Sequence, residues 1–382
     1  MRGSNGLPAM RLVYVHNSPV PNKAASTVQV MRMCSAFTRL GHDVELIVPV
    51  SGTEAAPTAK ETADYYGCAG EFAIHRIPLG RAGWFGFAYH AAQRAKAVRA
   101  DLVYGRCVRS CAVAAMRGMQ VMHEAHGPLE AYSRSGQLAF AYLARSSRLR
   151  RLIVINQALA DYYAASFPAL ARPPLVAPSA TDPVSSFPPL RPLPEGGRLR
   201  IGYVGSLHPG KGMELIAELA RGTDHEFIVA GGDDESIARW KSQLGSRVNF
   251  LGHVPNRDVS AIIGSFDIAL APYLTSISGA GTRFNLAQWM SPLKLFEYMA
   301  HGRPIITSDL PSIREIVQDG VEAMLCDPAR PDQWIATAER LAGDFTLRQR
   351  LGVAALEAFS ARHEWSGRAK LIIAASAAPR VH

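Results

Sequence analysis

The apolar residues of the N-terminal half follow a pattern of alternating strands and helices. An apolar run at 12–15 ends in a polar loop, and apolar positions at helical spacing follow between residues 28 and 40. A second apolar run at 44–48 comes next, so this segment predicts a strand, a helix and a parallel strand. Further apolar runs occur at 102–104, 120–122 and 152–155. Their spacing predicts a doubly wound α/β sheet.

The C-terminal half begins the same pattern again. A run at 200–204 leads through a glycine-rich loop into a helix predicted from about residue 213. Strand-like runs then recur at 227–230, 248–251, 268–271 and 304–307. This half therefore predicts a second parallel sheet, and ligands of such sheets bind beyond the carboxyl ends of the strands.

The connection between the two halves is marked by proline. Nine prolines lie between residues 168 and 194, which is too many for a helix or a central strand. We therefore predict an N-terminal domain at 1–182, a linker at 183–197 and a C-terminal domain at 198–363. The predicted fold class is α/β, with two Rossmann-like domains whose parallel sheets face each other across a cleft.

Length and composition agree with this division. A chain of 382 residues suits two domains, and 48% hydrophobic with 19% charged residues is typical of a soluble globular protein. No apolar run approaches the roughly 18 residues of a membrane-spanning helix. The first nine residues lack the apolar centre of a signal peptide, so a cytoplasmic location is expected. Five scattered cysteines without a CxxC pair predict reduced thiols rather than a zinc site or disulfides.

The basic charge of the chain is confined to its first half. Residues 1–190 hold 20 Lys and Arg against 11 Asp and Glu, whereas residues 191–382 hold 21 of each. This asymmetry favours an anionic partner for the N-terminal half, such as a phospholipid surface or a phosphate-bearing acceptor. A solvated basic surface without a partner is the alternative, and the arginine cluster at 145–151 allows either interpretation. Nucleic acid is less favoured, because aromatic and basic residues do not interleave as stacking platforms require.

The loop after the run at 200–204 resembles a phosphate loop. Residues from Gly205 to Lys211 match the first seven positions of that motif between a strand and a helix. The eighth position is Gly212, which lacks the hydroxyl that would hold magnesium. We therefore predict a phosphate site without a metal ion. The alternative is an ordinary glycine and proline loop with a solvated lysine.

A helix with clear boundaries is predicted over 291–302. Ser291 is the expected N-cap, Pro292 the first helical residue and Gly302 the end. Lys294 then lies in the first turn, where the helix dipole disfavours a cation unless an anion lies opposite. Glu297 shares its face and would accept hydrogen bonds from a sugar diol. The pair indicates a nucleotide site, with a solvent-facing Lys–Glu pair as the alternative.

The order of these motifs resembles that of the group 1 (family 4) retaining glycosyltransferases of GT-B fold. The resemblance covers nearly the whole chain. The segments that carry it are Gly205 to Gly212, Phe250-Leu251-Gly252, Ser291 to Ala300, Lys23 to Met31, Leu40 to Val44 and Val176 to Asp182.

The resemblance assigns roles to residues of this sequence. Lys211 and Lys294 would neutralise the leaving diphosphate, and Glu297 would hold the ribose hydroxyls. The donor site would also include Gly205, Ser206, Ser291 and Leu295. His126 matches the family's cleft histidine that touches the transferred sugar, although a lone histidine is more often a neutral core or loop residue. The segment from about 364 to 382 would pack back on the N-terminal domain.

The implied activity is transfer of a sugar from a nucleotide-diphosphate donor to an acceptor hydroxyl with retention. A UDP-sugar is favoured and a GDP-sugar is the alternative, with no metal or other cofactor required. The expected setting is bacterial polysaccharide, lipid-linked glycan or glycoconjugate biosynthesis, with an anionic or lipid-linked acceptor and peripheral contact with the inner membrane face.

Three features depart from the family pattern. Ser206 stands where many members have a phosphate-binding arginine, and Ala24-Ala25 stand where the first loop has a glycine pair. Trp289 stands eight residues before Glu297, where an acidic residue is common. Two other functions therefore stay open: a nucleotide-sugar epimerase or hydrolase of the same fold, and a catalytically inactive nucleotide-sugar-binding protein.

Overall fold

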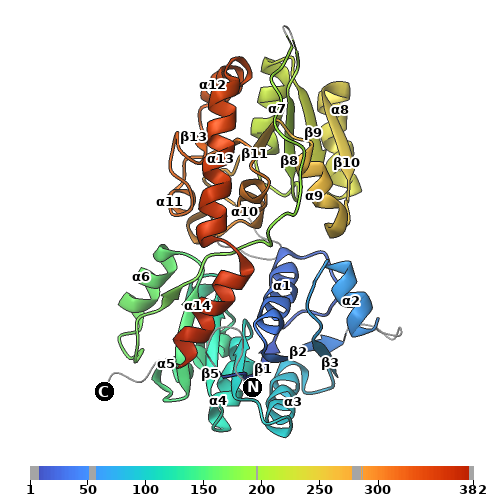
Figure 1. The fold of residues 1–382 in the computed structure, drawn as a ribbon. Coiled ribbons are helices and arrows are strands. Elements are labelled where there is room, and N and C mark those ends of the chain that lie inside the picture. The colour runs from blue at the N-terminus through green and yellow to red at the C-terminus, as the bar shows by residue number, and fades with distance from the viewer. Residues whose placement is uncertain (1–7, 51–56, 195–196, 278–284, 286, 378–382) are drawn as a thin grey trace. The chain divides into compact units, whose positions relative to one another are not determined.

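The chain folds into two compact units. The computed structural model describes residues 8–50, 57–194, 197–277, 285 and 287–377. The first unit comprises Met1–Pro178 together with Trp365–His382, and the second comprises Ser179–Glu364. The first segment of this unit ends at Pro178, whereas the expected domain boundary is at residue 182. Figure 1 shows the helices and strands of each unit with their labels.

The first unit is built on a seven-stranded sheet in the order β3-β2-β1-β4-β5-β6-β7, and all its pairings are parallel. The five apolar runs that predicted strands in this half all form strands. Two strands were not predicted from apolar runs: β3, because His75 and Arg76 interrupt its apolar residues, and β7, because it has only two residues. The strands are β1 (Arg11–Val15), β2 (Asp43–Val50), β3 (Ala73–Pro78), β4 (Leu102–Gly105), β5 (Val121–Ala125), β6 (Leu149–Val154) and β7 (Leu175–Val176).

Helices cover both faces of this sheet. The last helix, α14, follows the whole second unit in the chain, yet it packs against α1 and β6 of the first unit. Three other helices, α3, α4 and α5, pack side by side in that order. The helices are α1 (Ala25–Arg39), α2 (Ala59–Tyr65), α3 (Gly83–Ala97), α4 (Val108–Met116), α5 (Arg134–Arg145), α6 (Gln157–Ser166) and α14 (Trp365–Ala377).

The second unit is built on a six-stranded sheet in the order β10-β9-β8-β11-β12-β13, also entirely parallel. All five runs predicted as strands form strands, and only the three-residue β13 was missed. The strands are β8 (Arg200–Val204), β9 (Glu226–Ala230), β10 (Val248–Gly252), β11 (Ile268–Ala271), β12 (Ile305–Ser308) and β13 (Met324–Cys326). The predicted α/β class with two parallel sheets is confirmed.

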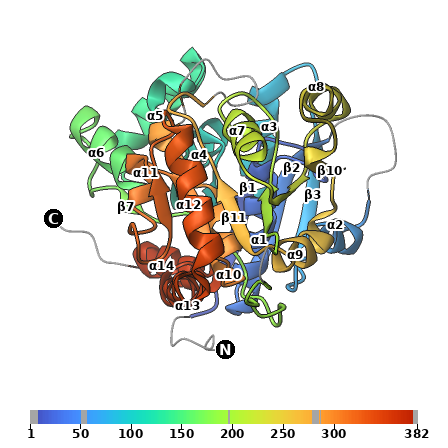
Figure 2. The same cartoon turned by 90° about the horizontal axis from the view of Figure 1, so that it is seen from above.

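Two hydrophobic clusters form the core of the second unit. One joins the sheet to α7, α8 and α12 and contains Trp240 and Trp334. The other joins it to α10, α11 and α13 and contains Leu295 and Phe296. Figure 2 shows α8 beside the edge strand β10. The helices are α7 (Met213–Gly222), α8 (Asp234–Leu244), α9 (Asn256–Gly264), α10 (Leu293–Ala300), α11 (Pro311–Arg314), α12 (Pro331–Gly343) and α13 (Phe345–Arg362).

The N-cap prediction for α10 is wrong. The helix begins at Leu293, and Pro292 occupies the N-cap position with an extended backbone and no side-chain cap. The hydroxyl of Ser291 instead accepts a hydrogen bond from the backbone amide of Ser179, with the two atoms 2.8 Å apart. Ser291 therefore fixes an incoming chain segment, while Lys294 remains in the first turn as predicted.

Candidate functional site

A glycine-rich loop connects β8 to α7. Gly205, Gly210 and Gly212 have φ angles of 152°, 83° and 92°, a region that side chains disfavour. A Cβ atom at Gly212 would collide with the carbonyl oxygen of Pro272, and one at Gly210 with that of Ser276. The loop can lie this close to the segment after β11 only because residues 210 and 212 are glycines. This packing holds the loop and Lys211 at the start of α7.

Lys294 is buried directly beneath this loop. Its ammonium nitrogen lies 3.5 Å from the ring centroid of Tyr203 and 5.2 Å from that of Tyr273. A Cβ atom at Gly205 would lie only 2.7 Å from the same nitrogen. Lys294 is 9% exposed, and its nitrogen has no hydrogen-bond partner among the residues that the structure describes. Burying an ammonium group without such a partner costs free energy, and an anion bound beside it would offset that cost.

A second lysine adds to this positive charge. Lys211 is half-buried, and its ammonium nitrogen lies 5.4 Å from the same Tyr273 ring. Burial lowers the pKa of Lys211. Burial lowers the pKa of Lys294 well below its usual range, and repulsion from Lys211 lowers it further, while Glu297 acts in the opposite direction. An anion between the two lysines would relieve both the desolvation and the repulsion.

Glu297 lies on the next turn of α10 from Lys294 and is half-buried. Its carboxylate is close enough to raise the pKa of Lys294, and a carboxylate beside a phosphate site can accept hydrogen bonds from a neighbouring diol. The structure therefore brings together Gly205, Lys211, Lys294 and Glu297 in the second unit.

The other residues predicted for this site have different surroundings. The side chain of Leu295 is fully buried in the core, so a contact with a donor would have to come from its backbone. The carbonyl oxygen of Ser206 accepts a hydrogen bond from the hydroxyl of Tyr203 at 2.7 Å. Trp289 ends a short 3₁₀ helix before α10 and is half-buried.

His126 lies just beyond the carboxyl end of β5 in the first unit. Its Nε2 atom is 2.6 Å from Oε1 of Glu124, which is the fourth residue of that strand. Oε1 of Glu124 also accepts hydrogen bonds from Arg368 of α14 at 2.9 Å and from Gln29 of α1 at 2.6 Å. The hydroxyl of Tyr104 donates to the other carboxylate oxygen.

These contacts set the charges of the cluster. Burial would raise the pKa of Glu124, but Arg368 and the hydrogen bond from His126 hold it well below its usual range. Burial, reinforced by Arg106, lowers the pKa of His126 to about 4. Burial, again with Arg106, lowers the pKa of His16, at the end of β1, to about 3. Near neutral pH Glu124 is therefore anionic, whereas both histidines are neutral.

His126 was predicted as a site residue from the sequence, but its hydrogen-bond partners were not. An available signal was an acidic residue within the apolar run of β5, because a buried carboxylate requires a partner. The sequence held no signal for Arg368, which is brought to Glu124 only by the packing of α14.

Across the ranges given above, no group of three or more His, Cys, Asp or Glu side chains lies close enough together to hold a metal ion. Within the same ranges, none of the helices is long and apolar enough to span a bilayer. Metal-independent chemistry stays a prediction.

Two protein-family models match the chain. The model described as Glycosyltransferase Family 4 matches residues 26–183, and that described as Glycosyl transferases group 1 matches residues 198–344. Together these two ranges cover most of each unit, and they leave out residues 184–197 between them as well as β1, α13 and α14.

Curated relatives are similar over part of their length. The phosphatidyl-myo-inositol mannosyltransferase of Mycobacterium leprae is 29% identical over 192 residues, covering 48% of each protein. The D-inositol 3-phosphate glycosyltransferase of Corynebacterium diphtheriae is 26% identical over 185 residues, covering 44% of this chain and 40% of that protein. The chain thus spans about half the length of the curated relatives it matches.

Solved structures share the fold over almost the whole chain. HepE of Anabaena, in complex with UDP and glucose, superposes with a TM-score of 0.70 at 16% identity, covering 96% of this chain and 98% of that one. A sucrose-phosphate synthase from Thermosynechococcus elongatus gives 0.70 at 15% identity over 96% and 98%.

Replacing Lys294 with methionine should stabilise the isolated protein. Removing a buried cation without a hydrogen-bond partner should raise the free energy of unfolding by about 1–3 kcal/mol near neutral pH. The pKa of Lys294 is lower in the folded protein than in the unfolded chain, whose value is near 10.5. Between these values the unfolded chain binds one more proton, so stability rises with pH up to about 10.5. Lys294→Met should reduce that rise.

Urea unfolding at several pH values measures both effects. Lys241→Met removes an exposed lysine from α8 and is the matched control. A Lys294→Met protein that is less stable than the original, with an unchanged pH dependence, would contradict this description of the charge.

Proposed function

Because the chain belongs to the glycosyltransferases of group 1 and family 4 and has their GT-B fold, we propose that it transfers a sugar from a nucleoside diphosphate sugar to an acceptor hydroxyl. Membership of this family supports glycosyl transfer as the reaction. The donor, the stereochemistry and the acceptor are parts of our proposal.

The observation that carries the proposal is the buried ammonium of Lys294 beneath the glycine loop. When the bond between the anomeric carbon and the diphosphate oxygen breaks, negative charge develops on the diphosphate. Fixed cations at that position lower the barrier because they interact more strongly with the leaving group than with the intact donor. Lys294 and Lys211 face the same tyrosine ring and are suited to bind the two phosphates.

Glu297 would select the nucleoside part of the donor. A carboxylate accepts hydrogen bonds from both hydroxyls of a ribose, and Glu297 lies one turn from the lysine assigned to the phosphates. We favour a UDP-sugar because the structural neighbour HepE is described in complex with UDP and glucose and with UDP-glucose. A GDP-sugar is the alternative.

Retention of the anomeric configuration is proposed from the family resemblance. His126 would contact the transferred sugar, as discussed below. Two other functions remain candidates: an epimerase or hydrolase of the same fold would need no acceptor, and an inactive binding protein would release no diphosphate. Trp289, which stands in place of an acid, is the best support for the inactive protein, whereas the presence of both lysines together with Glu297 favours transfer.

An anionic acceptor is proposed for the first unit. The relatives named above act on phosphatidyl-myo-inositol and on inositol 3-phosphate according to their names, and the first half of this chain carries the whole excess of positive charge. Such an acceptor is compatible with glycan synthesis at the inner membrane face, where anionic lipids attract basic surfaces.

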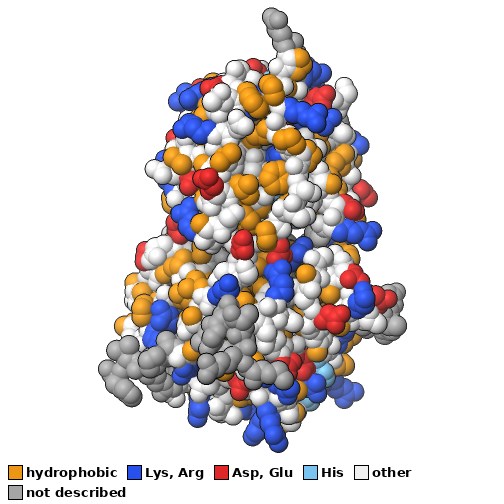
Figure 3. Space-filling model, viewed as in Figure 1, with side chains coloured by type: hydrophobic (Ala, Val, Ile, Leu, Met, Phe, Trp, Pro, Cys, Tyr) orange, Lys and Arg blue, Asp and Glu red, His pale blue; other side chains and the backbone are white. Residues whose placement is uncertain are grey.

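The surface over α3, α4 and α5 is suited to such contact. None of the three helices contains an Asp or Glu. The three most exposed large apolar side chains of the described residues lie here: Phe85 at 65%, Met116 at 59% and Leu138 at 73%. Figure 3 shows several Lys and Arg side chains along the lower margin of the first unit, where Figure 1 places these helices. Exposed apolar and cationic side chains together are typical of membrane-surface binding.

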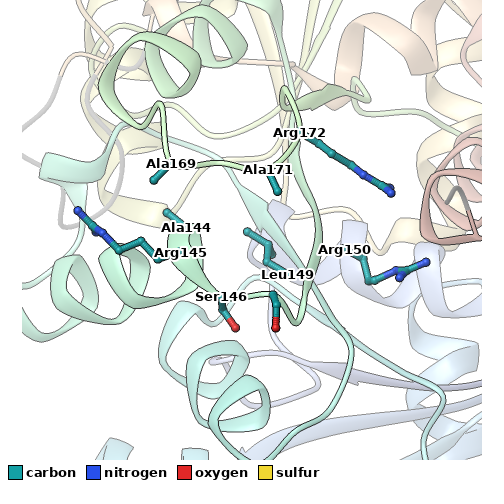
Figure 4. A pocket seen from close by; sticks show the side chains of 9 residues that line it. Ala144, Arg145, Ser146, Leu149, Arg150, Ala169, Ala171 and Arg172 are labelled. Carbon is teal, nitrogen blue, oxygen red and sulfur yellow. The ribbon is translucent and has the colours of Figure 1, made fainter. Parts of the chain in front are cut away.

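A cavity of about 230 Å³ adjoins the end of α5. Its lining includes Ala144 and Leu149 together with Arg145, Arg150 and Arg172. In Figure 4, Arg150 and Arg172 point to one side and Arg145 to the other, so the three guanidinium groups do not converge on one anion. The guanidinium group of Arg150 already donates two hydrogen bonds to the carbonyl oxygen of Ser376, at 2.8 and 3.0 Å. We therefore assign these arginines to a basic surface and not to a discrete phosphate site.

Glu297→Gln tests the proposed reaction. We expect kcat/KM for acceptor-dependent release of UDP from a UDP-sugar to fall about ten- to hundredfold, because the ribose hydroxyls lose hydrogen bonds to a charged acceptor. Glu235→Gln, an exposed acid in the first turn of α8, is the control. An unchanged kcat/KM for Glu297→Gln would refute its role, and UDP release that needs no acceptor would instead support a hydrolase.

Binding to vesicles tests the proposed membrane contact. The protein should float with vesicles containing phosphatidylglycerol but not with pure phosphatidylcholine. Reversing two charges of α5, Arg134→Glu with Arg145→Glu, should weaken binding about thirtyfold or more, since each basic residue contributes about 1 kcal/mol. The same reversal at the exposed Arg257 and Arg330 of the second unit is the control. Equal loss in both variants, or no binding of the original protein, would remove this part of the proposal.

A further inference from the structure

Glu124 holds five hydrogen bonds although its side chain is completely buried. Oε1 accepts from His126 at 2.6 Å, from Arg368 at 2.9 Å and from Gln29 at 2.6 Å. Oε2 accepts from the hydroxyl of Tyr104 and from the second nitrogen of Arg368 at 3.4 Å. The exposed fractions of the two charged side chains are 0% for Glu124 and 3% for Arg368. An ion pair this deeply buried and this fully hydrogen-bonded has one rigid geometry.

This geometry determines which nitrogen of His126 carries the proton. A carboxylate oxygen only accepts hydrogen bonds, so a ring nitrogen 2.6 Å from Oε1 must donate one. Nε2 of His126 is therefore protonated. Because burial and Arg106 lower the pKa of His126 to about 4, the ring is neutral near pH 7, and its proton is the one on Nε2. Nδ1 then carries a lone pair.

The neighbouring amide supports this assignment. Gln29 lies 3.4 Å from Nε2 of His126 through its own Nε2 atom, a distance that would otherwise suggest a different tautomer. The orientation of the Gln29 amide is fixed, because its oxygen accepts a hydrogen bond from Arg106 at 3.1 Å. Its nitrogen therefore donates to Glu124, and Gln29 and His126 are two donors to one carboxylate oxygen.

Arg368 reaches this cluster from the C-terminal end of the chain. It lies in α14, and besides Glu124 it donates to the carbonyl oxygens of Ala177 and Pro178, at 3.1 and 2.8 Å. Those two residues follow β7, so one guanidinium joins the end of the sheet, the carboxylate and the returning helix. The carboxylate that orients His126 therefore depends on a helix encoded after the second unit.

We propose that Glu124 and Arg368 are positioning residues that fix the Nε2-protonated tautomer of His126, so that Nδ1 accepts a hydrogen bond from a sugar hydroxyl of the bound substrate. The inference rests on the proposed function in that the ligand is a sugar. His126 is 19% exposed, and Nδ1 has no hydrogen-bond partner among the described residues. In this role His126 orients a hydroxyl and transfers no proton.

The tautomer is measurable without substrate. In the protein labelled with ¹⁵N-histidine, the two ring nitrogens differ strongly in chemical shift according to which one is protonated. We expect Nε2 of His126 to have the shift of a protonated nitrogen and Nδ1 that of a bare one, unchanged between about pH 6 and 8. A proton on Nδ1, or titration of His126 within that range, would overturn the proposal.

A paired substitution tests the positioning role. Glu124→Gln with Arg368→Met removes the ion pair without leaving a buried charge unpaired. We expect the ring of His126 to populate both tautomers and kcat/KM for transfer to fall about ten- to hundredfold, while UDP still raises the melting temperature by the same amount. Glu71→Gln with Arg81→Met, two exposed residues of the same unit, is the control. Unchanged transfer with mixed tautomers would overturn the proposal.

A second pair of variants applies even if the paired substitution unfolds the protein. His126→Asn keeps an oxygen acceptor close to the position of Nδ1, whereas His126→Leu has none. We expect transfer to be retained better in the asparagine variant, and equal loss in both would contradict an acceptor role. If the original protein shows the expected tautomer but transfers no sugar, the proposed function fails and not the assignment of the proton.

Discussion

The burial of one ammonium group without a hydrogen-bonding counter-ion is the constraint on which the second unit depends. The ammonium group of Lys294 contacts the Tyr203 ring and the glycine-rich loop. Residue 205 of that loop must be glycine, because a side chain there would collide with the ammonium nitrogen. The aromatic rings attract the ammonium group through cation–π interactions, but they cannot accept a full hydrogen bond as a carboxylate would. Lys211 lies nearby and repels the charge of Lys294. Such an arrangement costs stability in the free protein. An anion bound beside the two lysines would offset that cost.

The first unit handles buried charge in the opposite way. Glu124 and Arg368 neutralise each other, and every oxygen of the carboxylate is hydrogen-bonded. The cluster therefore needs no ligand, and it provides a rigid support for His126. The two units thus treat buried charge differently: the second holds a lysine without a hydrogen-bond partner among the described residues, and the first holds a neutral histidine in a defined orientation.

Much of this could be predicted from the sequence, because its signals are local. The apolar runs predicted ten of the strands, and the spacing of the glycines predicted the loop that contacts Lys294. The position of Lys294 in the first turn of α10 followed from the residues around it, even though the helix begins at Leu293 and Ser291 is not its cap. These features depend on residues within one or two turns of each other.

The features that were missed depend on tertiary packing. The strand β3 contains histidine and arginine and so lacks an apolar run. Arg368 meets Glu124 across a separation of 244 residues, which no spacing rule predicts. The burial of Lys294 was also not predicted, since a lysine in a first turn is ordinarily exposed.

The proton balance of nucleotide binding tests the account most directly. Near pH 9, titration calorimetry with UDP in buffers of different ionisation enthalpy should show proton uptake, because the diphosphate returns the pKa of Lys294 towards its usual value. The uptake should be reduced in Lys294→Met. Binding with the same enthalpy in every buffer would contradict the central claim that the diphosphate binds beside Lys294 and raises its lowered pKa.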